Sequence, residues 1–257
     1  MRKLHFKTTQ EAWEGLQEYL LLSPKIDEEI DSTVSGSNIL SYDNYIIIDK
    51  AEVDPNFDYG MMFGYTKHKW GSLISNYLNM HELDKLRNTI LDYELRNTAA
   101  YTAHMCFNNA HSNGKGCLMS LCFQKKMKEK KPVCYFSVRA GELTKRVIFD
   151  FLFIQRMIEY IYNTNEIEIR YSAPLLFVNL ESFLMYNQWK PFKKLFKGKE
   201  DYPRVKKCME LYDKFMAKDI SKMTYGVHIR SARQLQKHTN SEIKQVPPLL
   251  AKNLYLW

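Results

Sequence analysis

Apolar and polar positions along the first third of the chain predict a helix, a strand and a second, longer helix. Residues 8–22 place apolar side chains at helical spacing behind a threonine that can cap the first turn. The β-branched run YIIID within residues 39–49 is typical of a buried strand. Residues 72–94 return to helical spacing, and we expect an interruption near Asn79. Between these segments, residues 53–70 are rich in turn residues and aromatics, which predicts irregular structure that lines a site.

The second half of the chain predicts a β-hairpin followed by a buried helix. Residues 99–107 and 116–123 have strand character and are separated by a loop-like segment, and residues 132–139 predict the next strand. The lysine-rich segment KKMKEKK then becomes the exposed turn of a hairpin. The run VIFDFLFIQRMIEYIY, which follows Thr144, is apolar on most sides and predicts a buried helix. Residues 166–178 predict either a pair of strands or one bent strand.

This order of elements, together with the composition, predicts a single α+β domain over residues 1–257. Hydrophobic residues make up 45% and aromatic residues 14% of the chain, which is globular rather than disordered. The longest apolar runs are too short to span a bilayer, so we expect no membrane association. We also expect no signal peptide, and the irregular spacing of the five cysteines favours the reducing cytoplasm over a disulfide framework.

The net charge of +8 indicates an anionic partner such as a nucleotide or a nucleic acid. The basic residues cluster at 125–131, 190–199 and 206–207, which favours a functional field. A generally lysine-rich surface explains the same charge without any partner, and the composition does not separate these two interpretations.

Two cysteines in the stretch GCLMSLCFQ, Cys117 and Cys122, raise the question of a metal site or a nucleophile. No CxxC pair is present, and odd spacing along a strand places the two side chains on opposite faces, so we expect no shared metal. A reactive thiolate needs a nearby cation, and Arg139 ends the strand that is predicted to lie beside Cys117. The alternative is that Cys117 packs as a small buried hydrophobic residue.

Several motifs within residues 58–180 resemble the core of the thymidylate synthase superfamily. In that family a nucleophilic Cys on a strand is followed by a hairpin, an Arg and a buried helix that opens with Phe-Asn. Here Cys117 matches the nucleophile, Arg139 matches the Arg, and Phe149-Asp150 opens the helix. The resemblance implies a thymidylate synthase-like α+β fold, in which a mixed or antiparallel sheet is packed by a long buried helix and forms a homodimer across the sheet.

The resemblance also implies a pyrimidine C5 methyl- or hydroxymethyltransferase. Cys117 would add to C6 of the base, while Arg139 would hold the substrate phosphate and keep the thiol ionised. Asp150, beside Phe149 in the substrate site, would read the base. The deoxycytidylate hydroxymethylases of this family have Asp at this position, and a carboxylate accepts a hydrogen bond from the amino group of cytosine. Arg96 lies where the family has an arginine that reaches the phosphate in the partner subunit.

The implied one-carbon donor is 5,10-methylenetetrahydrofolate, with no metal. Glu142 stands where the family has Asp, and Phe63 stands for the Tyr of an Asp-x-Gly-x-x-Tyr-Gly motif. We place Glu142, Trp70 and Phe63 on the cofactor side of the site. The sequence does not separate a methyl product from a hydroxymethyl product.

The chain also departs from the family pattern, which keeps two other hypotheses open. No Arg occurs between Arg2 and Arg87 to serve as the family's N-terminal phosphate ligand, and PLLF at 174–177 replaces the family's His-x-Tyr. The first of these hypotheses is a divergent relative that binds nucleotide or nucleic acid without folate chemistry. The second is an assembly protein in which residues 116–150 are only a packed hairpin and helix.

Overall fold

A mixed sheet with helices on one face forms the core of the described part of the chain. The computed structural model describes residues 3–22, 32–35, 38–53, 77–107, 117–144 and 146–179, and short pieces at 197–198, 200–201, 205–206 and 209–210. Phe63, Trp70 and most of the segment 53–70 lie outside the described residues, as does the loop expected between 107 and 117.

The sheet has eight strands, and six of them form the continuous order β1-β3-β8-β6-β5-β4. Strand β2 pairs with β3, and β7 pairs with β8. The strands are β1 Lys3–Thr8, β2 Ser32–Ser35, β3 Asn38–Lys50, β4 Tyr101–Cys106, β5 Leu118–Lys125, β6 Val133–Val138, β7 Ala140–Glu142 and β8 Glu168–Asn179.

Both parallel and antiparallel pairs occur in the sheet, which confirms the expected α+β class. The pairs β1 with β3, β6 with β8 and β7 with β8 are parallel. The pairs β3 with β8, β5 with β6 and β4 with β5 are antiparallel. The segment 166–178 is therefore the single strand β8, which pairs with β3 on one side and with β6 and then β7 on the other.

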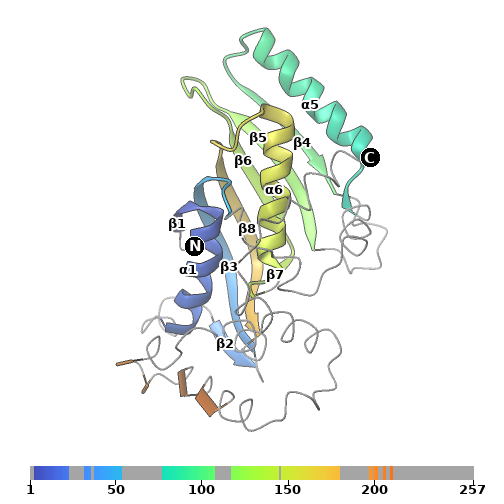
Figure 1. Ribbon diagram of the computed structural model, residues 1–257. Coiled ribbons are helices and arrows are strands. Elements are labelled where there is room, and N and C mark those ends of the chain that lie inside the picture. Colours follow the sequence, from blue (N-terminus) through green and yellow to red (C-terminus); the bar gives the residue numbers. More distant parts are fainter. Residues whose placement is uncertain are drawn as a thin grey trace, which may run out of the picture.

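The described helices are α1 Thr9–Leu22, α5 Met80–Leu95 and α6 Val147–Tyr162. Helices α1 and α6 lie on the same face of the sheet, and α5 lies beside β4 at one end of it (Figure 1). None of the described helices is both long and apolar enough to cross a lipid bilayer.

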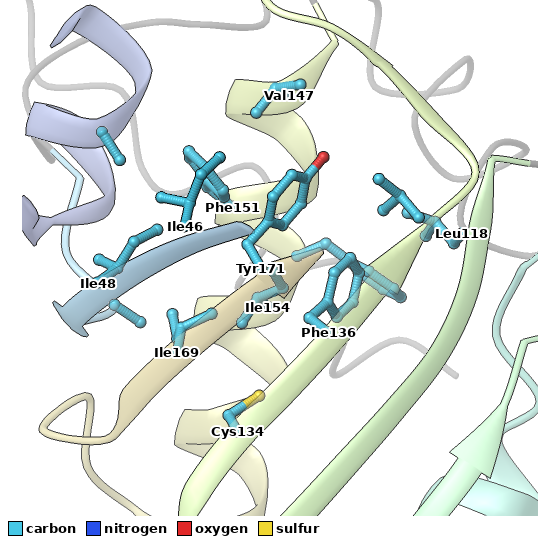
Figure 2. Close-up of a cluster of buried hydrophobic side chains, with 14 of the residues drawn as sticks. Ile46, Ile48, Leu118, Cys134, Phe136, Val147, Phe151, Ile154, Ile169 and Tyr171 are labelled. Carbon is cyan, nitrogen blue, oxygen red and sulfur yellow. The ribbon is translucent and has the colours of Figure 1, made fainter. Parts of the chain in front are cut away.

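Helix α6 lies over the centre of the sheet because its sequence is apolar around most of its circumference. Phe151 and Ile154 of α6 are fully buried, and they lie close to Ile46, Phe136 and Tyr171 of the sheet (Figure 2). The prediction of a buried helix at this position is confirmed.

Three other local predictions are also confirmed. The predicted first helix is α1, and Asn79, where an interruption was expected, is the N-cap of α5 and accepts a hydrogen bond from the His81 N–H. The lysine-rich segment forms the connection between β5 and β6, and residues 126–131 are exposed. Three short strands, β1, β2 and β7, were not predicted.

Gly141 of β7 lies in a space too small for a side chain. A Cβ atom there would lie 2.7 Å from Val147 Cγ2, 2.9 Å from Leu176 Cδ2 and 3.1 Å from the Tyr171 hydroxyl. We expect Gly141→Ala to lower the free energy of unfolding by about 1–3 kcal/mol, because tightly packed cores resist added volume. Urea denaturation monitored by circular dichroism measures this loss.

Gly15→Ala in α1 is the matched control. A Cβ at Gly15 would meet the Phe6 ring at 2.6 Å, but Phe6 is only partly buried and its ring can move. Alanine is also favoured over glycine within a helix by about 1 kcal/mol. An equal loss of stability in the two variants would contradict the tight packing around Gly141.

Candidate functional site

Cys117 lies at the point where the chain enters β5, beside the end of β6. It is half-buried, and its backbone N–H donates to the Tyr77 hydroxyl at 3.4 Å. Its carbonyl oxygen accepts a hydrogen bond from the backbone N–H of Arg139 at 2.7 Å. The expected proximity of Cys117 and Arg139 therefore holds for the backbone. The Arg139 residue itself is exposed.

Asp150 lies in the first turn of α6, and its carboxyl group is largely shielded by protein. Burial raises its pKa from the ordinary 3.8 to about 7, while a hydrogen bond from Tyr171 and the charge of Arg146 oppose that shift. The Tyr171 hydroxyl donates to Asp150 Oδ2 at 3.4 Å. Near neutral pH this carboxyl is therefore present in both its ionised and its neutral form.

The Tyr171 hydroxyl group bonds to Asp150 and interacts electrostatically with Cys117. It is fully buried in β8, and its hydroxyl points toward the region between Val147, at the start of α6, and Leu118, at the start of β5 (Figure 2). Burial raises the Tyr171 pKa, and the negative charges of Asp150 and Cys117 raise it further. The phenol therefore stays neutral and is available as a hydrogen-bond donor.

Tyr77 interacts with the same two groups from another side. Burial has the largest effect and raises the pKa of Tyr77. The hydrogen bond with the Cys117 backbone lowers this pKa, and the charges of Cys117 and Asp150 raise it. Tyr77 and Tyr171 each interact electrostatically with both Cys117 and Asp150, and they also hydrogen-bond to the Cys117 backbone and to the Asp150 carboxyl, respectively. We call Cys117, Asp150, Tyr77 and Tyr171 the Cys117–Asp150 cluster.

The two tyrosines of this cluster were not identified from the sequence. Tyr171 occupies a buried strand position, where a tyrosine hydroxyl usually needs a hydrogen-bond partner. That general preference is the available sequence signal for Tyr171, and it does not name Asp150 as the partner.

Cys122 lies in a different environment from Cys117. It sits between buried Leu121 and Phe123, so its side chain faces away from α6. Burial raises its pKa, which disfavours a thiolate. The β5–β6 register is irregular between Leu118 and Ser120. The two cysteines are thus in separate surroundings, as expected. The expectation assumed regular alternation of side chains along β5, however, and that assumption is wrong.

Arg96 is not part of the cluster within its own chain. It is exposed at the C-terminal end of α5, and its Nε donates to Asp92 Oδ1 at 2.9 Å. The strand that follows begins at Tyr101, which pairs with Lys125 at the far end of β5 from Cys117.

Glu142 and Phe149 are both buried, on either side of the turn that leads into α6. Glu142 is 6% exposed, and its Oε1 accepts a hydrogen bond from the Thr144 N–H at 3.1 Å. Phe149 is 5% exposed and belongs to the hydrophobic core. Both residues therefore support the start of α6, next to Asp150.

The cluster combines a thiol, a carboxyl group that titrates near neutral pH and two phenols that stay neutral. Within the described ranges, no three His, Cys, Asp or Glu side chains gather closely enough to hold a metal ion. A thiol can add covalently to an electrophile, and a carboxyl group that titrates near neutral pH can transfer a proton.

Comparison with protein-family models found no match to this sequence, and comparison with curated proteins found no significant similarity.

Proposed function

We propose that the protein is a pyrimidine C5 methyl- or hydroxymethyltransferase that acts on a cytosine nucleotide such as dCMP. The observation that supports this most directly is the Cys117–Asp150 cluster. Cys117 at the start of β5 and Asp150 at the start of α6 interact with the same two tyrosine hydroxyls. In the proposed reaction the nucleophile and the base-reading group act on one pyrimidine ring, and the tyrosine neighbours that Cys117 and Asp150 share support these roles.

In the proposed reaction, Cys117 Sγ adds to C6 of the pyrimidine and the C5–C6 double bond opens, which makes C5 nucleophilic. Asp150 binds the other edge of the ring. In its neutral form the carboxyl donates to N3 of cytosine and accepts from the exocyclic amino group, and in its ionised form it accepts from the amino group alone. The pKa of about 7 makes both forms accessible at neutral pH.

The proposed one-carbon donor is 5,10-methylenetetrahydrofolate, which would supply the carbon that joins C5. Of the three residues assigned to it, Glu142 lies within the described ranges. Its carboxylate is buried and accepts a hydrogen bond from the Thr144 N–H, and its assignment to the cofactor stays a prediction. The steps proposed above therefore depend on Cys117 and Asp150 alone.

We further propose that the protein is a homodimer whose subunits meet across the face of the sheet away from α1 and α6. Most described residues on that face are partly exposed, among them Tyr45, Ile47, Tyr135 and Leu175. Arg96 lies away from the Cys117–Asp150 cluster of its own chain, as required of a residue that serves the site of a partner subunit. The free thiols of Cys106, Cys117, Cys122 and Cys134 are compatible with the proposed cytoplasmic location.

Release of tritium from C5 of the substrate tests this proposal. We expect the full-length protein to release tritium from [5-³H]dCMP faster than from [5-³H]dUMP, because addition of Cys117 to C6 labilises the C5 hydrogen. The assay is run with and without 5,10-methylenetetrahydrofolate, which separates addition by the thiol from one-carbon transfer. Absence of release from both nucleotides, with a folded protein and folate present, contradicts the proposal.

A second candidate function is binding of a nucleic acid without folate chemistry. The exposed lysines of the turn between β5 and β6, Lys126, Lys128, Lys130 and Lys131, favour it. Binding of single-stranded DNA that weakens steeply with salt, in a protein that releases no tritium, would support this candidate over the enzyme.

A further inference from the structure

The two ends of the described sheet differ in how they are protected against pairing with another chain. At one end, β1 has the sequence KLHFKT, and its Lys3 and Lys7 are exposed. At the other end, β4 has the sequence YTAHMC, with no permanently charged side chain and no proline. Its register with β5 is continuous over all six residues. Natural edge strands are usually blunted by charges, proline or bulges, and β4 has none of these.

The hydrogen bonds of β4 show which of its backbone groups point away from the sheet. The Phe107 N–H donates to the Met119 carbonyl at 3.1 Å and continues the register of the β4–β5 ladder. In an antiparallel pair, residues alternate between those that bond the neighbouring strand and those that point outward. The outward N–H and C=O groups of β4 therefore belong to Thr102, His104 and Cys106.

A groove of about 400 Å³ runs along these outward groups. Helix α5 forms the opposite wall, next to β4, with the Tyr93 and Tyr101 rings stacked 5.2 Å apart. The groove is lined by Glu82, Lys85, Leu86 and Thr89 of α5 and by Thr102, Ala103, His104, Met105 and Cys106 of β4.

We propose that this groove binds an extended peptide segment of a partner protein, which adds to β4 as a further strand. A groove between an edge strand and a helix suits this mode, in which main-chain hydrogen bonds supply affinity and alternate side chains supply specificity. The groove does not include the Cys117–Asp150 cluster, and the proposal is independent of the chemistry proposed for that site.

The dimensions favour a single extended segment over a second copy of the protein. Paired strands lie about 4.8 Å apart, whereas packed helices lie about 8–10 Å apart. In an antiparallel pair of β4 strands from two copies, both α5 helices lie on the same face of the joined sheet. Each α5 packs against its own β4, so the two helices would be brought closer than helices pack. A peptide without a flanking helix avoids this clash.

The side chains that line the groove define the peptide that fits it. Leu86, Ala103 and Met105 are apolar and at most 5% exposed, so they offer a small apolar surface to side chains at alternate positions of the peptide. Glu82 is half-buried and forms no ion pair within the part of the chain that the structure describes. A basic side chain on the α5 side of the peptide would provide its counter-charge. The preferred ligand is therefore a strand with alternating valines and one lysine on the same side.

Hydrogen–deuterium exchange of the full-length protein tests this proposal with a defined probe. The probe is the end-capped peptide Thr-Lys-Thr-Val-Thr-Val-Thr, used together with its reversed sequence so that both strand directions are covered. We expect saturable slowing of amide exchange at Thr102, His104 and Cys106 with at least one of the two. A peptide with Glu in place of Lys should bind more weakly to the native protein and more tightly to Glu82→Lys.

His104→Pro and His104→Ala form a matched pair of variants. Proline removes the outward N–H of His104, which β5 does not use, and should weaken peptide binding by about tenfold while the fold is retained. Alanine removes only the side chain and should bind as the native protein does. Equal binding by both variants overturns the proposal, and so does a lack of protection by either peptide. Protection that rises with protein concentration, without peptide, would identify a second copy as the occupant and also overturn it.

Discussion

Cys117→Ser is expected to lower the rate of tritium release from [5-³H]dCMP by about 10³-fold or more. A serine hydroxyl is far less acidic than a thiol, so it is not converted to a nucleophile at neutral pH without a dedicated base. The substitution changes one atom of a half-buried side chain, and the backbone bonds of Cys117 to Tyr77 and Arg139 do not involve the sulfur. We therefore expect the variant to fold, and the initial rate of tritium release measures the effect.

Cys122→Ser is the control, because Cys122 is also half-buried in this region but faces away from α6. It should retain the native rate. Alkylation by iodoacetamide provides a second measurement that does not depend on turnover. Cys117 should react faster than Cys134, which is fully buried and whose pKa burial raises. A native rate for Cys117→Ser, or equal alkylation of the two thiols, contradicts the role of Cys117 as a nucleophile.

Asp150→Asn is expected to stabilise the protein above pH 7 and to remove much of the dependence of its stability on pH. The pKa of Asp150 is about 7 in the folded protein against an ordinary 3.8, so the folded state holds a proton that the unfolded state releases. Stability contributed by this group therefore falls as pH rises from about 4 to about 7. A difference of about three pKa units corresponds to a loss of about 4 kcal/mol in the stability of the native protein, and this loss is complete above pH 7. Urea denaturation at pH 5 and pH 8 measures it.

Asp92→Asn is the matched control, since Asp92 is exposed on α5 and pairs with Arg96. Loss of such a surface pair should change the stability by less than about 1 kcal/mol, with the native pH dependence retained. If native protein and Asp150→Asn lose the same stability between pH 5 and pH 8, the raised pKa of Asp150 is wrong.

Asp150→Asn should also change which base is preferred. An asparagine amide carries both a donor and an acceptor, so it can accept from the N3–H of uracil and donate to O4, whereas the ionised carboxylate of Asp150 only accepts and favours the amino group of cytosine. The ratio of tritium release from dCMP to that from dUMP should therefore fall. An unchanged ratio, in a variant that still turns over, indicates that Asp150 does not contact the base.

The parts of the fold that were predicted from the sequence are those that local pattern determines. The apolar run of α6, the capping position of Asn79 and the exposed lysine-rich turn each depend on residues close together in the chain. The place of β1 in the sheet was not predicted because KLHFKT, although it alternates like a strand, pairs in parallel with β3, far along the chain. No local pattern reports such a pairing.

In the candidate site, too, residues related by a local motif were predicted and residues brought together by packing were not. Cys117, Arg139 and Asp150 were identified because a motif relates their spacing, and the structure brings the backbones of the first two together. Tyr77, which precedes α5, and Tyr171 of β8 were missed because their hydroxyls reach the site only when these segments pack against β5 and α6. The sequence also did not predict the buried position of Glu142, since its hydrogen bond from the Thr144 N–H depends on how the chain turns into α6.

The pairing of β3 with β8 has a consequence for how the chain folds. The Asn44 side chain donates to the Ala173 carbonyl across a sequence separation of 129 residues, and both strands lie in the interior of the sheet. Such distant contacts raise the relative contact order, and domains of high contact order fold slowly. During synthesis, β3 has to wait for β8 to leave the ribosome. During that time the isoleucines of β3 are exposed and can aggregate. The rate of translation and the binding of chaperones to the first half of the chain should therefore determine the yield of folded protein.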